Sequence, residues 1–199
     1  MYRKGQHTVA VNATSQQQKG KEMEKGDKTA QEKKIQYMVN DLIKMAERKG
    51  ATYYGSWIED GRQYVAGNHF CVSLSKPVEL PEKDGSSVKK QIYDYMENAR
   101  IMNEKETALP DELNQMVKTL KKERGRYRSK RIFCFLGDRE AAVNAEYLLM
   151  LSQVTGARSV YLSEKRPEKS IIYGTGENGA FIVLPVSFAE EDQKNFWME

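Results

Sequence analysis

The first regular pattern of apolar and polar positions predicts a helix that begins at residue 29. Thr29 and Glu32 have the spacing of a capping box, in which each side chain bonds the backbone of the other residue, and Gly50 marks the end of the pattern. The apolar positions recur at helical spacing, which predicts one buried and one charged face. They are Ile35, Met38, Val39, Leu42, Ile43 and Ala46.

Three short runs rich in β-branched and aromatic residues come next and predict strands at 53–58, 62–66 and 69–74. Asp60 and Gly61 lie between the first two runs and are typical of a tight hairpin turn. This part of the chain is therefore predicted to form a β-meander that follows a helix.

The same order of elements returns in the second half of the chain. A strand at 132–136 precedes a helix from about 142 to 154 that ends at Gly156, and three further strands are predicted at 159–163, 170–173 and 180–186. A helix followed by three strands thus occurs twice. This order favours one α+β domain built from two similar halves.

Between the halves, two more helical patterns at 88–99 and 110–125 predict a helical-hairpin insertion at about 86–131. We expect the domain to span 29–188 and to carry a tail at 189–199. Residues 1–28 are predicted to form a flexible arm, because they contain too few large apolar residues to offset the entropy of ordering. Within that arm, 7–11 could form a short strand, but no partner strand lies within hairpin range.

Composition narrows the class of protein. The 199 residues are 39% hydrophobic and 30% charged, and the formal net charge is +4, which by itself does not indicate nucleic acid. No apolar run reaches the length of a membrane span, so we expect a cytoplasmic protein. The two cysteines, Cys71 and Cys134, lie in apolar runs, and we expect reduced, buried thiols rather than a disulfide.

The motifs that could carry catalysis have simpler structural interpretations. Residues 174–179 fit the G-x-G-x-x-G pattern, but a strand follows where a dinucleotide loop needs a helix, so a hairpin turn using Asn178 and Gly179 is favoured. His69 with Cys71 or Cys134 could form a dyad, although a core thiol is the better interpretation. No metal-ligand spacing is found. We predict no enzyme, no cofactor and no metal site.

Charge is strongly segregated in the middle of the chain. Eight basic residues and one acidic residue, Glu123, fall within 118–131, whereas the chain from 132 onward has six basic and ten acidic residues. Such a cluster can bind phosphates, with Tyr127 available for stacking, but it is also typical of a helix C-terminus followed by a solvated loop. The basic residues are Lys118, Lys121, Lys122, Arg124, Arg126, Arg128, Lys130 and Arg131.

Two segments of the second half resemble the C-terminal domain of bacterial sliding clamps, the β subunits of DNA polymerase III. The sequence V-N-A-E-Y-L-L at 143–149 matches the N-x-x-[YF]-L-L helix of that family, and A-F-I-V-L-P-V at 180–186 matches its last strand. In the first half, 57–61 and 64–69 look like a clamp hairpin, although Gly67-Asn68 reverses the usual Asp-Gly order. The resemblance implies a DNA-clamp-like fold.

The same resemblance implies where partners would bind. Clamps of this family have three such domains per chain and close a ring from two chains, so a homo-oligomeric ring of this chain would need about six copies. In this family the helices face DNA, but residues 144–156 contain no lysine or arginine. We therefore expect the first helix and the basic cluster at 118–131 to contact DNA instead. Its basic residues are Lys33, Lys34, Lys44, Arg48 and Lys49.

A protein-docking groove is expected near Pro185 and Val186, where the family has a peptide pocket. Phe196 and Trp197 in the tail either pack back onto the domain or serve as a short docking peptide. The sequence therefore predicts a non-catalytic, clamp-like module that binds double-stranded DNA without sequence preference and docks replication proteins. The alternative is a protein-interaction domain with the clamp fold and no DNA binding.

Overall fold

The computed structural model of the protein describes residues 29–48, 50–80, 83–124, 132–137 and 140–186. The predicted N-terminal arm with its strand and the predicted tail with Phe196 and Trp197 lie outside these residues. Among the described residues, no helix is both long enough and apolar enough to cross a membrane.

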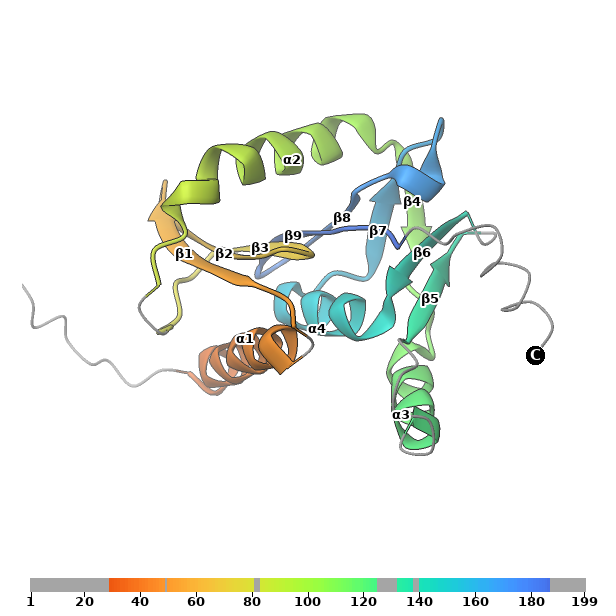
Figure 1. The fold of residues 1–199 in the computed structure, drawn as a ribbon, viewed down its shortest axis with the longest axis horizontal. Helices are drawn as coiled ribbons and strands as arrows, with labels where there is room; N and C mark the ends of the chain where they lie inside the picture. The colour runs from red at the N-terminus through yellow and green to blue at the C-terminus, as the bar shows by residue number, and fades with distance from the viewer. Residues whose placement is uncertain (1–28, 49, 81–82, 125–131, 138–139, 187–199) are drawn as a thin grey trace, which may run out of the picture.

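The described residues form an α+β fold with four α-helices, a seven-stranded sheet and a two-stranded hairpin (Figure 1). The elements of the first part are α1 (Ala30–Arg48), β1 (Tyr53–Glu59), β2 (Arg62–Gly67), β3 (Phe70–Leu74), η1 (Ser86–Val88), α2 (Lys89–Met102), β4 (Lys105–Ala108) and α3 (Leu113–Arg124). Those of the second part are β5 (Phe133–Leu136), β6 (Ala141–Asn144), α4 (Ala145–Thr155), β7 (Ser159–Leu162), η2 (Pro167–Lys169), β8 (Ile172–Gly176) and β9 (Gly179–Val183).

The sheet joins the two halves of the chain through its central strands. Its strand order is β1-β2-β3-β9-β8-β7-β4, and each pairing is antiparallel. The first half contributes α1 and β1–β3 and the second contributes α4 and β7–β9, so the predicted order of a helix and three strands is confirmed in both halves. Helices α1 and α4 pack against each other on one face of the sheet, and α2 covers the opposite face (Figure 1).

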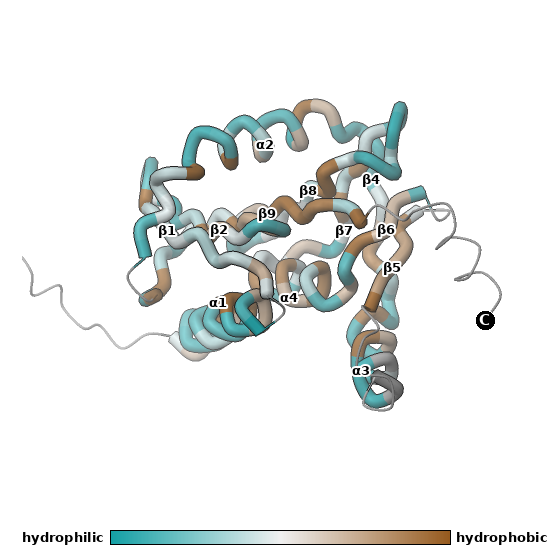
Figure 2. Tube along the Cα trace, viewed as in Figure 1, coloured by the Kyte–Doolittle hydropathy of each residue, from teal (hydrophilic) through white to brown (hydrophobic). Residues whose placement is uncertain are grey.

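The main core lies between the sheet and the pair α1 and α4. Both central strands, β3 and β9, are buried at every residue, because helices cover the two faces of the sheet. Phe181 of β9 is fully buried there with Val72, Leu42 and Leu148, and burial of such a side chain stabilises the fold by roughly 2–3 kcal/mol. Figure 2 shows that β9 is hydrophobic, whereas α1 and α2 on either side of it are largely hydrophilic.

A second, smaller core lies under α2. It contains Trp57, Cys71 and Ile182 from the sheet, and from α2 only Ile92 and Ala99 are buried. A β-bulge between Tyr53 and Gly55 shifts the register of β1 by one residue. Since side chains alternate across a strand, this shift places Trp57 on the α2 face rather than on the face that Tyr53 occupies.

The predicted helix boundaries are confirmed where the capping residues act locally. In α1 the Glu32 N–H donates to Thr29 Oγ1 at 3.2 Å and the Thr29 N–H donates to Glu32 Oε2 at 2.9 Å, which is the predicted capping box. Helix α4 ends at Gly156, which adopts the left-handed conformation.

The predicted start of α4 at about residue 142 is wrong. Asn144 caps the helix by accepting hydrogen bonds from the N–H groups of Glu146 and Tyr147, so the helix begins at Ala145. The preceding apolar residues form β6, which pairs with β5 through contacts such as Cys134 with Val143. A short apolar run fits either a helix or a strand, and here pairing with β5 makes residues 141–144 a strand.

The helical-hairpin insertion is also wrong, because α2 and α3 lie on opposite sides of the sheet (Figure 1). Between them β4 pairs with β7 and forms an edge of the large sheet. The apolar residues of the two helices are buried in different places: Ile92 lies in the core under α2, and Leu113 and Val117 lie in the main core. The insertion is therefore a helix, a strand and a helix.

Both predicted hairpins are present, but the second turn lies one residue earlier than the predicted Asn178 and Gly179. Asp60 and Gly61 have φ of 49° and 73°, the left-handed values of a two-residue turn that matches strand twist. The G-x-G-x-x-G segment turns at Glu177 and Asn178 and continues into β9, so no helix follows to receive a pyrophosphate. The positive φ of 148° falls on Gly179, where a Cβ atom would lie 1.9 Å from the Ser73 carbonyl oxygen.

Candidate nucleic-acid interface

The solvent face of α1 carries a row of basic side chains, which we call the basic ridge. Lys33, Lys34, Lys44 and Arg48 are exposed, and Tyr37 between them is 67% exposed. These positions fall on one side of the helix at 3.6 residues per turn. The ridge is therefore a row of positive charges around an exposed aromatic ring, interrupted by the partly exposed carboxylate of Asp41.

The ridge faces solvent because the opposite side of α1 is needed for the core. Val39, Leu42 and Ala46 are fully buried against the sheet and α4. Within the part of the chain that the structure describes, none of the four basic groups of the ridge forms an ion pair, and the Arg48 Nε donates to the Lys44 carbonyl oxygen at 3.2 Å. Their charge is thus available to a ligand in solvent.

Helix α3 supplies a second group of lysines on the same side of the sheet. Leu113 and Val117 fix this helix in the main core, and α3 packs against α4 (Figure 1). Lys118 and Lys122 are exposed at its surface. Lys121 differs, because its Nζ lies 3.4 Å from Oε1 of the buried Glu146.

The ion pair of Lys121 assigns that residue a structural role. Glu146 is 4% exposed and lies in the first turn of α4, where a carboxylate also interacts favourably with the helix dipole. Removing Lys121 would leave this carboxylate with fewer counter-charges in a buried place. Of the remaining residues predicted to bind DNA, only the backbone of Arg124 belongs to the described part of the chain. Outside it lie Arg126, Arg128, Lys130, Arg131 and Lys49.

Helix α4 lies between the two basic helices and has a neutral surface. Its half-buried Leu149 and Met150 and its exposed Gln153 face outward, and its sequence contains no lysine or arginine. Because α4 packs on both α1 and α3, the helical side of the molecule has a neutral centre and basic flanks.

Pro185 and Val186 connect the large sheet to the β5–β6 hairpin. Pro185 forms an isolated antiparallel bridge with Val143, and the Val186 N–H donates to the Ala142 carbonyl oxygen at 2.8 Å. The strand predicted for 180–186 thus leaves the sheet after Val183. The side chains of Pro185 and Val186 remain partly exposed and can contact a partner.

Cys71 and Cys134 differ from His69 in their exposure to solvent. Both cysteines are buried and free, and burial raises the pKa of both thiols, that of Cys134 to about 11. His69 is exposed and its ring contacts Tyr147 at 6.2 Å between centroids. Over the described residues, no three histidine, cysteine or acidic side chains gather where they could hold a metal ion.

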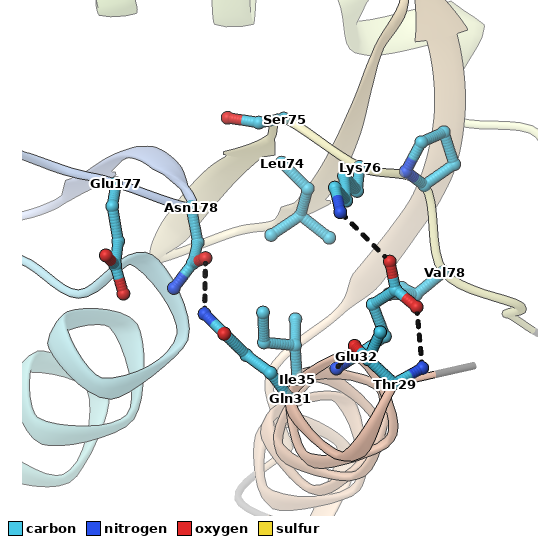
Figure 3. A pocket seen from close by; sticks show the side chains of 11 residues that line it. Thr29, Gln31, Glu32, Ile35, Leu74, Ser75, Lys76, Val78, Glu177 and Asn178 are labelled. Atoms are coloured by element: carbon cyan, nitrogen blue, oxygen red, sulfur yellow. Dashed lines mark hydrogen bonds and ion pairs between the residues drawn. The ribbon is translucent and has the colours of Figure 1, made fainter.

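A small pocket of about 130 Å³ lies at the start of α1 (Figure 3). Its polar groups bind one another: Lys76 Nζ lies 3.1 Å from Glu32 Oε1, and Gln31 Nε2 donates to Asn178 Oδ1 at 3.2 Å. The Thr29 N–H and then Lys76 hold the pKa of Glu32 below its ordinary value. These contacts tie α1 to the β8–β9 turn, and the pocket is a junction between the halves.

Comparison of the chain with protein-family models, with curated proteins and with solved structures found no match in any of the three. Sequence reasoning found the basic residues of the ridge but missed Tyr37 at its centre. The signal was present, because Tyr37 follows Lys33 and Lys34 by one helical turn and is one of the polar-face positions of the same pattern.

Proposed function

We propose that this protein is a non-catalytic, clamp-like module that associates with DNA through phosphate contacts made without regard to sequence. The observation that carries the proposal is the basic ridge, whose four cationic groups lie on one exposed helix face and form no ion pair with the other residues that the structure describes. Lysine and arginine in such a row contact the phosphate backbone, which is the same for every base sequence. Tyr37 adds a ring and a hydroxyl that can contact sugar or phosphate.

The arrangement of elements supports the clamp-like part of the proposal. The two halves meet at the pairing of β3 with β9, and their helices α1 and α4 lie side by side on one face of the sheet. In sliding clamps, helices of each domain face DNA, and here the corresponding side carries the ridge and the exposed lysines of α3. Pro185 and Val186 would belong to a docking site for replication proteins.

DNA binding can be measured by fluorescence anisotropy of two labelled duplexes of unrelated sequence, from about 50 to 200 mM salt. We expect similar affinity for both duplexes and a steep loss of affinity with salt. In a variant with Lys33, Lys34, Lys44 and Arg48 changed to Gln, the slope of log affinity against log salt should fall by up to about 3.6, since each of the four lost phosphate contacts contributes about 0.9.

A matched control removes the same number of charges elsewhere. Lys90 on α2 and Lys165, Arg166 and Lys169 around η2 are exposed, and changing them to Gln should leave DNA affinity nearly unchanged. A separate variant for α3 should change Lys118 and Lys122 and spare Lys121, because Lys121 stabilises Glu146.

The outcomes separate the proposal from its alternative. Equal losses in the ridge variant and the control would indicate attraction by net charge alone and would contradict a defined interface. Absence of salt-dependent binding in the unmodified protein would favour a protein-interaction domain without DNA contact. Light scattering of the same samples tests for a closed oligomer, which a working ring requires.

A further inference from the structure

A cleft of about 570 Å³ lies on the other face of the sheet, between α2 and the strands beneath it. We call it the α2 cleft. Its floor is formed by two small residues, Ser73 of β3 and Ala180 of β9, which pair directly across the sheet. Tyr64 of β2 pairs with Ser73 on the other side and forms a wall. The cleft exists because small side chains lie under α2 in the two central strands.

The hydroxyl of Ser73 points to a ligand in this cleft. Ser73 is 1% exposed, lines the floor, and its Oγ has no hydrogen-bond partner. Buried hydroxyl groups in folded proteins nearly always have a partner, because water was lost in burying them. The Oε2 atom of Glu59, at the edge of the cleft, is buried and unpartnered as well. Both atoms can accept a hydrogen bond from a bound N–H group.

The walls are aromatic and held in place by one another. The Trp57 and Tyr64 rings are stacked with centroids 5.4 Å apart, and Trp57 Nε1 donates to Tyr93 Oη at 3.2 Å. Tyr93 of α2 meets Tyr64 edge to face at 4.9 Å, and Tyr173 lines the cleft on the β8 side. Fixed aromatic rings favour cations, because the ring face carries partial negative charge.

The charges around the cleft select the same kind of ligand. Carboxylates outnumber guanidinium groups in the lining, and the ion pair of Arg100 with Glu97 at 2.6 Å neutralises one charge of each sign. The charged residues of the lining are Glu59, Asp60, Asp94 and Glu97 against Arg62 and Arg100. At one end, Lys89 Nζ lies 2.6 Å from Glu59 Oε1 and 5.8 Å from the Tyr93 ring centroid. The ammonium group of Lys89 thus already lies between a carboxylate and an aromatic ring, as a bound cation would.

We propose that the α2 cleft binds a small organic cation, with an ammonium or guanidinium group that donates to Ser73 Oγ and is held by the carboxylates at the rim. Tyr64, Tyr93 and Tyr173 contact the carbon chain and the face of the cation. This site lies across the sheet from the basic ridge and has the opposite charge. It does not depend on DNA binding, so either proposal can fail alone.

The test is an NMR titration of the ¹⁵N-labelled full chain with agmatine, which carries a guanidinium and an ammonium group. We expect saturable shifts of backbone amides near Ser73 and Asp94. Glucose and inorganic phosphate serve as neutral and anionic controls and should produce none. Asp94 is exposed, so Asp94→Asn preserves the fold and should weaken agmatine binding by about threefold to tenfold. Asp41→Asn on α1 makes the same change of charge and should leave the Kd unchanged.

Two further variants address the floor of the cleft. Ser73→Ala removes only the hydroxyl and should weaken binding by about fivefold, and Ser73→Val fills the space and should abolish it. A tighter Kd for agmatine than for N-acetylarginine methylamide assigns the site to free amines, and the reverse assigns it to an arginine side chain of a partner. Agmatine binding that Asp94→Asn and Ser73→Val leave unchanged, or phosphate binding without agmatine binding, would overturn the proposal.

Discussion

The two faces of the sheet are covered in different ways. On one face α1 and α4 bury a continuous apolar core and turn a basic or neutral surface to solvent. On the other face α2 lies over a thin core, and Ile92 and Ala99 are the only residues of this helix that are buried. An aromatic and acidic cleft lies between α2 and the sheet. The comparison teaches that the size of the residues in the central strands decides how each face is filled, because a cleft requires small residues where a continuous core requires large ones.

The largest effect should come from the main core. Phe181→Ala removes a fully buried ring and should lower the free energy of unfolding by ~4 kcal/mol, whereas Ile92→Ala under α2 should lower it by ~2 kcal/mol. Urea unfolding followed by circular dichroism measures both. Equal losses at the two positions would contradict the difference between the faces.

A smaller effect is expected in local opening of the two helices. Helix α4 buries eight of its residues and α2 buries two, so α2 should open at a lower free energy. Hydrogen exchange measured by mass spectrometry should show α2 amides exchanging at least about tenfold faster than α4 amides. Similar protection of both helices would show that α2 is held as firmly as the main core.

Elements whose signals are local could be predicted from the sequence. The runs of β-branched and aromatic residues in β2 and β3, the Asp60-Gly61 turn and the capping box of α1 each depend on neighbours within a few residues, and each is present. The bulge in β1 has one local sign, Gly55 with a φ of 130°, but its effect on register follows from pairing with β2. That register decides which face receives Trp57.

The candidate sites differ in the same way. The ridge residues Lys33, Lys34 and Lys44 could be chosen from one helical pattern, since they share a helix. The α2 cleft could not, because Ser73, Ala180 and Tyr64 come together only through strand order. The wrong helical hairpin has the same cause: two neighbouring helical patterns do not reveal that β4 lies between them and joins a distant strand.

The cysteines offer a third way to sharpen the comparison, through pH. Burial raises the pKa of Cys134 from 9.0 to about 11, so its thiol stays protonated in the folded protein while the unfolded chain ionises. Since the folded pKa is raised, this contribution to stability is present below pH 9 and is lost as pH rises toward 11.

The free energy of unfolding should therefore fall between these pH values, and Cys134→Ala should reduce the fall. Cys71 lies in the thinner core under α2, and burial raises the pKa of its thiol too. Cys71→Ala should therefore also reduce the fall in the free energy of unfolding. A fall that is unchanged in both variants would assign it to other titrating groups. Thiol labelling of the native protein at neutral pH should be slow at both positions.

The smallest effect is expected at the start of α1. Thr29→Ala removes one bond of the capping box and should lower the free energy of unfolding by ~1 kcal/mol, whereas Thr29→Ser should retain most of it. Helix α2 has no side-chain cap at Val88, so its start depends on packing alone. The difference again separates a helix fixed by local bonds from one fixed by a thin core.

Acid should remove the other half of the same capping box. The Thr29 N–H, and then Lys76, hold the pKa of Glu32 below its ordinary 4.5, so its contribution is present above 4.5 and is lost as pH falls through the lowered value. Because the two capping bonds support each other, the cost of Thr29→Ala should be smaller at about pH 3 than at neutral pH. Urea unfolding of both proteins at the two pH values measures this, and an equal cost at both would mean that the bonds act independently.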